Sequence, residues 1–203
     1  MIERLAAAAG RTVSRETMER LEGYVELLRE ESSRQNLVSA ATLNDVWERH
    51  IVDSAQLLRF EPHANASWVD LGSGAGLPGI VIACMTAGPV TLVEPRRLRA
   101  DFLHRVVDEL RLGAKVICAK VEKVVGHYEV ITARAVAAIP RLFEISQHLS
   151  TGKTVWVLPK GRVAASELAD AQRTWQGVFH VEQSATDPES HIVVGTGVRA
   201  KTS

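Results

Sequence analysis

The sequence has almost no cysteine, and this scarcity excludes several classes of protein. Only two of its 203 residues are cysteines, Cys84 and Cys118, and each lies within a short apolar stretch. Two isolated thiols provide neither a disulfide framework nor a cluster of zinc ligands. We therefore expect no metal site and a reduced, cytoplasmic protein.

Net charge and long apolar runs are also missing. Lysine and arginine together number 24, as do aspartate and glutamate, so the formal net charge is zero. The strongly basic balance that would indicate a phosphate-binding surface is absent, and a nucleic-acid partner must be inferred from local features. No apolar run reaches the roughly 7 to 15 residues of a signal-peptide core or the roughly 18 of a membrane span. We expect no membrane partner.

The composition suits one domain with a short N-terminal extension. Hydrophobic residues make up 46% of the chain, which is enough to bury a core. Residues 1–60, the extension, have helical periodicity. Residues 61–203, the domain, have a different pattern. In the first part, apolar residues at helical spacing predict a helix that Ser14 caps: Met18, Leu21, Val25 and Leu28.

A second helix is predicted to begin near Thr42 or Asn44. Its inward stripe would be formed by Trp47, Ile51, Ser54 and Leu58. His50 borders this stripe. One interpretation makes His50 a satisfied histidine at the edge of the core, with Arg49 and Asp53 as an ordinary i, i+4 ion pair.

From residue 61 onward, short β-branched runs alternate with helical segments. Strands are predicted at residues 67–71, 90–94, 115–118, 129–133, 154–158, 178–183 and 191–198. A helix at 97–112 presents Phe102, Val106 and Leu110 on its apolar face. The alternation predicts a largely parallel seven-stranded α/β sheet covered on both faces. The last two strands have no helix between them and should form an antiparallel hairpin at one edge.

The strongest local signal is a glycine-rich turn that follows the first predicted strand. It reads Asp70-Leu71-Gly72-Ser73-Gly74-Ala75-Gly76-Leu77-Pro78-Gly79. Glycines let the backbone turn tightly and approach a ligand closely. The spacing is G-x-G-x-G, whereas the dinucleotide fingerprint requires G-x-G-x-x-G and has its last glycine where this chain has Leu77. A plain strand-to-helix turn is the simpler alternative.

An acidic residue supports the ligand-binding interpretation of this turn. Glu94 ends the second predicted strand, roughly 20 residues after the turn, where a carboxylate can accept hydrogen bonds from both ribose hydroxyls of a nucleoside. Lys120-Val121-Glu122 follows the third strand and could read an adenine edge, although taken alone this tripeptide favours a solvated charge pair. Turn and acid together indicate an adenosine-containing cofactor.

At this point a family resemblance becomes visible. The motifs that carry it are Asn36-Leu37-Val38-Ser39, Arg49-His50-Ile51-Val52-Asp53-Ser54, the glycine turn, Val121-Glu122 and Thr132-Ala133-Arg134-Ala135. From about residue 14 to residue 198 the chain resembles ribosomal RNA small subunit methyltransferase G, the glucose-inhibited division protein B family. The resemblance implies a Rossmann-like class I methyltransferase that uses S-adenosylmethionine to methylate guanine N7 in the 530 loop of 16S rRNA.

The resemblance also implies site residues. Cofactor contacts are expected from Gly72, Leu77, Val121, Glu122 and Arg134, and the turn and ribose arguments add Asp70, Gly74, Gly76 and Glu94. Catalytic or substrate-contacting roles are expected for Arg134, Asn36, His50 and Lys120. Two positions depart from the family pattern. Lys120 replaces a frequent arginine and offers a point charge in place of a planar fork, and Val136 replaces a frequent aromatic residue that could have stacked on a base.

The implied chemistry suits these residues. Guanine N7 carries an exposed lone pair, so the transfer needs positioning and charge stabilisation but no general base. Methylation of an exocyclic amine would favour an Asn/Asp-Pro-Pro-aromatic turn after the fourth strand, and methylation of cytosine C5 would need a nucleophilic cysteine. Neither is found. The remaining alternatives are a nicotinamide-dependent oxidoreductase and a catalytically silent nucleotide- or RNA-binding module.

The expected partner is 16S rRNA or the small ribosomal subunit, bound by a monomer. RNA should approach the carboxyl ends of the strands. Arg96, Arg97 and Arg99 follow the second strand and Lys160 follows the fifth, so these cations could gather on one rim. The alternative interpretation is a solvated helix start.

Overall fold

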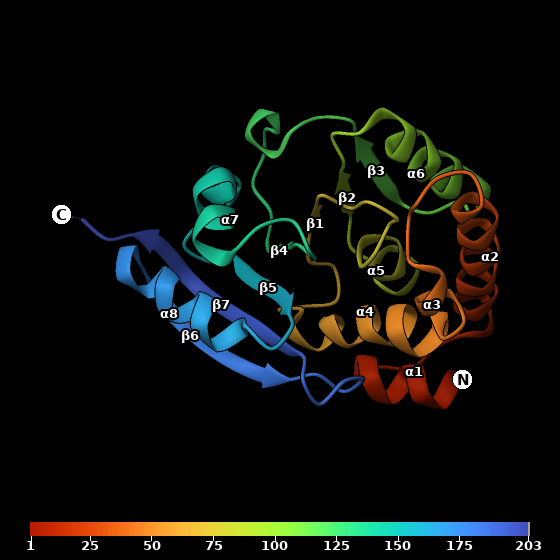
Figure 1. Cartoon of the computed structure of the whole chain (residues 1–203), viewed down its shortest axis with the longest axis horizontal. Helices are drawn as coiled ribbons and strands as arrows, with labels where there is room; N and C mark the ends of the chain where they lie inside the picture. The colour runs from red at the N-terminus through yellow and green to blue at the C-terminus, as the bar shows by residue number, and fades with distance from the viewer. Residues whose placement is uncertain (203) are drawn as a thin grey trace.

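A single twisted sheet organises the protein. The computed structural model describes residues 1–202, and its sheet has seven strands in the order β3-β2-β1-β4-β5-β7-β6 (Figure 1). The strands are β1 Trp68–Leu71, β2 Val90–Val93, β3 Ala114–Ile117, β4 Val130–Thr132, β5 Val155–Lys160, β6 Trp175–Gln183 and β7 His191–Ala200. The first five strands pair in parallel, and β7 pairs antiparallel with β5 and β6. The predicted mostly parallel sheet with its C-terminal hairpin is therefore confirmed.

Helices cover both faces of the sheet. The α-helices are α1 Ile2–Ala9, α2 Arg15–Ser32, α3 Ala40–Leu43, α4 Asp53–Ala55, α5 Gly79–Met85, α6 Arg97–Glu109, α7 Ile139–Ser146 and α8 Ala164–Thr174. Short 3-10 segments are η2 Gln56–Phe60, η3 Val121–Lys123 and η4 Gln147–Leu149. One buried cluster joins α1, α2, α5 and α6 to one face, and a second joins α7 and α8 to the other. Because both faces are covered, the central strands β1, β2 and β4 are buried along their whole length.

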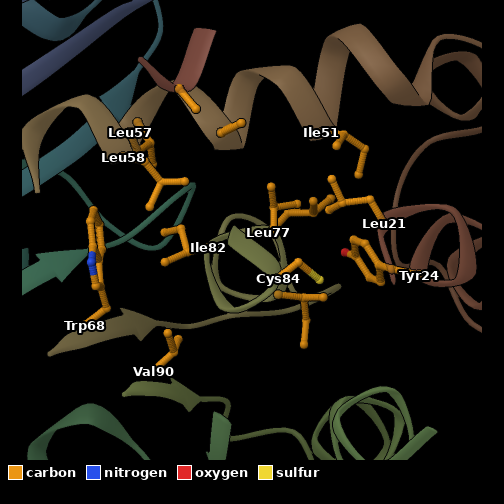
Figure 2. Close-up of a cluster of buried hydrophobic side chains, with 14 of the residues drawn as sticks. Leu21, Tyr24, Ile51, Leu57, Leu58, Trp68, Leu77, Ile82, Cys84 and Val90 are labelled. Carbon is orange, nitrogen blue, oxygen red and sulfur yellow. The ribbon is translucent and has the colours of Figure 1, made fainter. Parts of the chain in front are cut away.

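The N-terminal helices share their core with the rest of the chain. Figure 2 shows Leu21 and Tyr24 of α2 beside Leu77 and Cys84, which belong to the glycine turn and to α5. The predicted stripe of α2 is buried as expected. Ser14 caps this helix by accepting a hydrogen bond from the Thr17 N–H at 3.1 Å. One continuous core runs across residue 60. The domain boundary at this residue stays a prediction.

The segment after α3 differs from the single helix that its periodicity predicts. Trp47–Val52 forms a π-helix, η1, and α4 and η2 continue it. Ile51, Ser54 and Leu58 are buried as predicted, but so are most of the residues between them. The reason is that α1 packs on one side of this segment and α5 and β5 pack on the others. A segment covered from several sides loses the one-sided pattern of a surface helix.

The strand and helix ends show smaller differences. β6 begins at Trp175, three residues earlier than predicted, with an irregularity between Gln176 and Val178. α6 ends at Glu109, before the predicted residue 112. β6 is an edge strand whose residues are mostly exposed, so its first part lacks a continuous buried pattern that could have revealed it.

One buried hydrogen bond ties the N-terminal helices to the glycine turn, and it yields the first prediction. The hydroxyl of Tyr24, which is fully buried, donates to the Ala75 carbonyl oxygen at 2.8 Å. Tyr24→Phe keeps the ring but leaves that carbonyl without its donor, so we expect the free energy of unfolding to fall by about 1 to 3 kcal/mol. Urea unfolding measures the change. Tyr128→Phe is the matched control, because within residues 1–202 the Tyr128 hydroxyl makes no hydrogen bond; equal losses in both variants would contradict the prediction.

Candidate functional site

The glycine turn is fixed at both ends by hydrogen bonds. At its end, the Asp70 Oδ2 accepts a hydrogen bond from the Gly79 N–H at 3.0 Å, which joins the end of β1 to the start of α5. At its beginning, the Ser73 N–H donates to the Val93 carbonyl of β2 at 2.9 Å. A Cβ on Gly79 would lie 2.2 Å from Leu92 and 2.6 Å from Asp70 Oδ2, so only glycine fits there. Pro78 occupies the N-cap of α5 and not its first turn.

The three glycines inside the turn have different surroundings. A Cβ on Gly72 would lie 2.6 Å from Val136, and one on Gly76 would lie 2.6 Å from Ile80, so protein packing alone excludes side chains there. Gly74 has a φ of +56°, which favours glycine, yet no atom lies closer than 3.7 Å to the position of its Cβ. A Cβ on Gly74 would thus make only ordinary van der Waals contacts, so the positive φ and not protein packing favours glycine at this position.

Glu94 is hydrogen-bonded to the backbone of Gly74. Only 3% of its surface is exposed. Its Oε2 accepts from the Gly74 N–H and its Oε1 from the Arg96 N–H, both at 2.8 Å. A carboxylate offers about four lone-pair sites, so each oxygen retains one for a further donor. The predicted proximity of turn and acid is present, and the acid also orders the turn.

Asp70 provides a buried acceptor beside the turn. Within residues 1–202 its Oδ1 has no hydrogen-bond partner. Burial, aided by the negative charge of Glu94, raises the pKa of Asp70 to about 7 against an opposing effect of hydrogen bonds from Ser73 and Gly79 and of the Arg134 charge. An unpaired buried carboxylate oxygen is costly unless a donor reaches it. The site thus fits a ligand that brings a cationic donor to the end of β1.

The residues after β3 form the far wall of this region. Val121 is buried at the start of η3, and Glu122 is exposed, 3.7 Å from the Arg141 guanidinium. Lys120 is exposed at the N-cap of η3. In the sheet order, β2 and β1 separate β3 from β4, which leads to Arg134. The structure therefore brings Val121 and Glu122 to the expected edge but does not group Lys120 with Arg134.

Arg134 lies where three distant parts of the chain meet. It follows β4, and its Nη1 is 3.5 Å from Asp53 Oδ2. Asp53 Oδ1 in turn accepts from the Gln56 amide at 2.9 Å and from the Thr186 hydroxyl at 2.7 Å. Asp53 therefore links the N-terminal segment, the end of β4 and the loop between β6 and β7. The i, i+4 pair of Arg49 with Asp53 does not form, because Arg49 pairs with Asp187 at 3.5 Å.

His50 is buried next to this junction and is not the satisfied histidine that the simple interpretation expects. Only 8% of it is exposed, and neither ring nitrogen has a hydrogen-bond partner within the described part of the chain. Burial, together with the nearby Arg134 charge, lowers the pKa of His50 to about 4. The imidazole is therefore neutral at physiological pH and can donate or accept one hydrogen bond to a ligand.

Asn36 and the predicted rim arginines line a separate hollow. This hollow has a volume of about 390 Å³ and is lined by Gln35, Asn36, Arg96, Arg97, Leu98 and Arg99. The Asn36 carbonyl accepts from Arg99 at 3.3 Å, and Arg97 pairs with Asp101 at 2.9 Å. The structure thus places Asn36 with the arginines of α6 and away from His50 and Arg134.

Lys160 is not part of an open basic rim, which corrects one expectation. Its side chain is only 9% exposed, and its Nζ lies 2.9 Å from Glu167 Oε2 and donates to the Ala137 carbonyl at 2.7 Å. Glu167, Gln56 and Thr186 have no motif that could have revealed them, because their roles come from contacts between segments far apart in the sequence. Asp53 lies within a sequence motif in which helical spacing predicts Arg49 as its partner. Its partners in the structure are Arg134, Gln56 and Thr186.

The fold and this site together define a class of protein. Parallel strands in this order, an antiparallel C-terminal hairpin, a G-x-G-x-G turn after β1 and an acid after β2 are the features of a Rossmann-like class I methyltransferase. The fold has a solved counterpart in M. jannaschii TYW2 in complex with AdoMet, with a TM-score of 0.57 and 14% sequence identity over 76% of that chain and 75% of this one.

The sequence comparisons identify the family. The family model for rRNA small subunit methyltransferase G matches residues 17–192. Ribosomal RNA small subunit methyltransferase G of Erythrobacter litoralis is 50% identical over 91% of this chain and 90% of its own length. The protein of the same name from Sphingopyxis alaskensis is 48% identical over 91% of this chain and 80% of its own. The chain belongs to the rRNA small subunit methyltransferase G family, as its motifs indicate.

Two further findings concern the described residues. Within residues 1–202, no helix is long and apolar enough to cross a membrane. The same residues contain no group of three or more histidine, cysteine, aspartate or glutamate side chains placed to hold a metal ion.

The burial of Asp70 yields a prediction about stability and pH. The folded protein holds a proton on Asp70 up to about pH 7, whereas the unfolded chain loses it near the ordinary value of 3.8. The folded state therefore binds more protons between these values, and its stability falls as pH rises through this window, by about 1.4 kcal/mol per pH unit at most. Asp70→Asn has no proton to lose. We expect the stability of the wild type relative to this variant to fall between about pH 4 and pH 7 in urea unfolding; a constant difference would contradict the raised pKa.

Proposed function

We propose that the protein transfers a methyl group from S-adenosylmethionine to guanine N7 in the 530 loop of 16S rRNA. The observation that carries the proposal is that the glycine turn, with Glu94 beneath Gly74, lies directly against the segment of Arg134. Val136 of this segment is the residue that a Cβ on Gly72 would meet. A cofactor held over the turn is thus next to the side chain best placed to orient a substrate.

The residues on the cofactor side each have a defined task. Glu94 would accept hydrogen bonds from the ribose hydroxyls, using the lone pairs that Gly74 and Arg96 leave free. Asp70 Oδ1 would accept from the ammonium group of the methionine part, which supplies the missing donor. Val121 and Glu122, which follow β3, would contact the adenine. When bound, S-adenosylmethionine supplies a methyl group on a positively charged sulfur.

The substrate side needs no general base, because guanine N7 carries a lone pair. Among the described residues, no nucleophile stands ready to replace it. Burial raises the pKa of Cys84 to about 12, and Cys118 is exposed beyond β3, on the far side of β1 and β2 from Arg134. The task of Arg134, His50 and Asp53 is then to position the base and to exclude water. Asp53 acts by holding Arg134.

The expected cellular setting follows from this substrate. We propose a monomer that works in the cytoplasm and binds the small ribosomal subunit or a precursor of it. The arginines at the start of α6, next to Asn36, are available for phosphate contacts, since Arg96 makes no ion pair within residues 1–202. Lys160 is held by Glu167 and is not expected to contact phosphate.

A labelled-methyl experiment tests the function. The protein is incubated with methyl-labelled S-adenosylmethionine and, separately, with naked 16S rRNA, assembly intermediates and intact small subunits from a strain that lacks this enzyme. We expect one labelled base per 16S rRNA, mapped to guanine N7 in the 530 loop. Binding of S-adenosylmethionine without transfer to any of the three substrates would identify a silent binding module, and transfer to another base would overturn the assignment.

Glu94→Gln tests the cofactor assignment. The amide keeps the shape but removes the charge and one of the acceptors that Glu94 offers, so the hydrogen bonds to ribose lose about 1.5 kcal/mol or more. We expect the affinity for S-adenosylmethionine in a calorimetric titration to fall by about tenfold or more. Glu109→Gln, on the exposed end of α6, is the control and should bind normally. Unchanged binding by Glu94→Gln would refute the ribose contact.

Arg134 variants separate two roles for this side chain. Arg134→Ala should reduce methyl transfer strongly with little loss of stability, because the half-buried guanidinium contributes little to the core. Arg134→Lys should recover only part of the rate, since it keeps the charge but loses the planar fork. If cofactor affinity falls along with transfer, Arg134 binds the cofactor carboxylate; if transfer alone falls, it orients RNA. Arg173→Ala, an exposed residue near the end of α8, is the control, and near-normal transfer by Arg134→Ala would contradict both roles.

A further inference from the structure

The segment of Arg134, residues 134–137, has the glycine turn on one side and a cavity on the other. The volume of the cavity is about 480 Å³, within the range of ligand sites, which is roughly 300 to 1,000 Å³. Five parts of the chain enclose it: the segment of Asp53 and Gln56, residues 134–137 after β4, the end of β5, the start of α8, and the loop between β6 and β7 with the start of β7. Val136 stands between the cavity and Gly72, so the cavity and the turn are neighbours.

The lining combines apolar side chains with a few polar groups. Val136, Pro159, Val163 and Ile192 supply the apolar surface. Val136 and Val163 are among the exposed large hydrophobic residues of the protein. Exposed apolar side chains around a concave site commonly mark a place where a ligand packs. A planar aromatic ligand suits such walls better than a phosphate does.

Glu167 is the polar group that distinguishes this cavity. Its Oε2 accepts from the Ile139 N–H at 3.0 Å and from Lys160 at 2.9 Å. Its Oε1 has no partner within residues 1–202, although the residue lines the cavity. Asp53, the other carboxylate in the lining, accepts two hydrogen bonds at Oδ1 and pairs with Arg134 through Oδ2. Glu167 is thus a fixed carboxylate with one oxygen available to a ligand.

The nucleobases differ in what they offer to such an oxygen. Guanine presents two adjacent donors on its Watson–Crick edge, N1–H and N2–H₂. Adenine presents a donor beside an acceptor, and the lone pairs of that acceptor would face the carboxylate unpaired. Enzymes that modify a base commonly take it out of the stack into a pocket and read this edge by hydrogen bonds. A fixed carboxylate therefore selects guanine.

We propose that this cavity takes the extruded target guanine and that Glu167 is the specificity-determining residue, accepting hydrogen bonds from N1–H and N2–H₂. This inference rests on the proposed function. With N1 and N2 towards Glu167, the five-membered ring that carries N7 points away from Glu167 and is left to face the segment of Arg134 and Val136 next to the glycine turn. Lys160 is a positioning residue, because it holds Glu167 and the Ala137 carbonyl at the same time.

The wild-type protein alone provides the first test. Saturated with S-adenosylhomocysteine, it is titrated by NMR with GMP, IMP and AMP at millimolar concentrations. IMP lacks only the 2-amino group, and AMP reverses the donor pattern. We expect GMP to bind best, IMP several-fold more weakly and AMP about tenfold or more weakly than GMP. Equal affinity for GMP and IMP, or no binding of GMP, would overturn the proposal.

Glu167→Gln provides the second test, with Asp170→Asn as the matched control. Asp170 lies on the same helix but is exposed and outside the cavity. Glu167→Gln should bind GMP no better than IMP and should lose about tenfold or more in kcat/KM for methyl transfer to small subunits, with unchanged affinity for S-adenosylhomocysteine. Asp170→Asn should behave as the wild type. A Glu167→Gln variant that keeps both the preference for GMP and the rate would refute the assignment.

Two controls keep the outcomes distinct. Thermal melting reports whether Glu167→Gln has lost its fold, since Glu167 also supports the start of α7; in that event the comparison of GMP with IMP on the wild type decides the matter. If the wild type transfers no methyl group to guanine, the proposed function fails. If it does so and Glu167→Gln is unaffected, the proposed function stands and only the role of Glu167 is refuted.

Discussion

The hydrogen bond from the Gly79 N–H to the Asp70 carboxylate is the constraint on which the rest of the site depends. It closes the glycine turn across the end of β1 and sets where α5 begins. The contact is so close that a Cβ on Gly79 could not be accommodated. The bond also requires a carboxylate to be buried, and this burial raises the pKa of Asp70 to about 7. The carboxylate that closes the turn through Oδ2 is therefore also the one whose buried Oδ1 lacks a donor.

A second constraint explains why the N-terminal helices belong to the site. Tyr24 reaches the glycine turn from α2, and Asp53 reaches Arg134 from α4. Asp53 also binds Thr186 in the loop between β6 and β7. Neither the parallel sheet nor its glycine turn contains these groups. The extension and the hairpin therefore hold the glycine turn and the segment of Arg134 in fixed positions relative to one another, which is a task of positioning.

The sequence predicts the parts of this arrangement that are local. All seven strands, the hairpin, the glycine turn and its partner Glu94 follow from periodicity and from residue types at fixed spacing. The π-helix at Trp47–Val52 could not be read in this way, because it is covered from several sides and has no one-sided stripe. The pairing of Lys160 with Glu167 could not be predicted from the sequence for another reason. Lysine at a strand end looks like a free cation until tertiary structure brings an acid to it.

Backbone N–H groups hold the carboxylates of Asp70, Glu94 and Glu167 in place. Asp70 is anchored through Oδ2 by a backbone N–H, and its buried Oδ1 has no partner within residues 1–202; Glu167 is anchored through Oε2, and its Oε1 likewise has none. Glu94 is held at both oxygens by backbone N–H groups. A carboxylate fixed in this way loses little conformational entropy when a ligand donates to it, since its rotamer is already set. A reaction that needs no general base depends on such preorganised contacts, because alignment of donor and acceptor is then the main contribution that the protein can make.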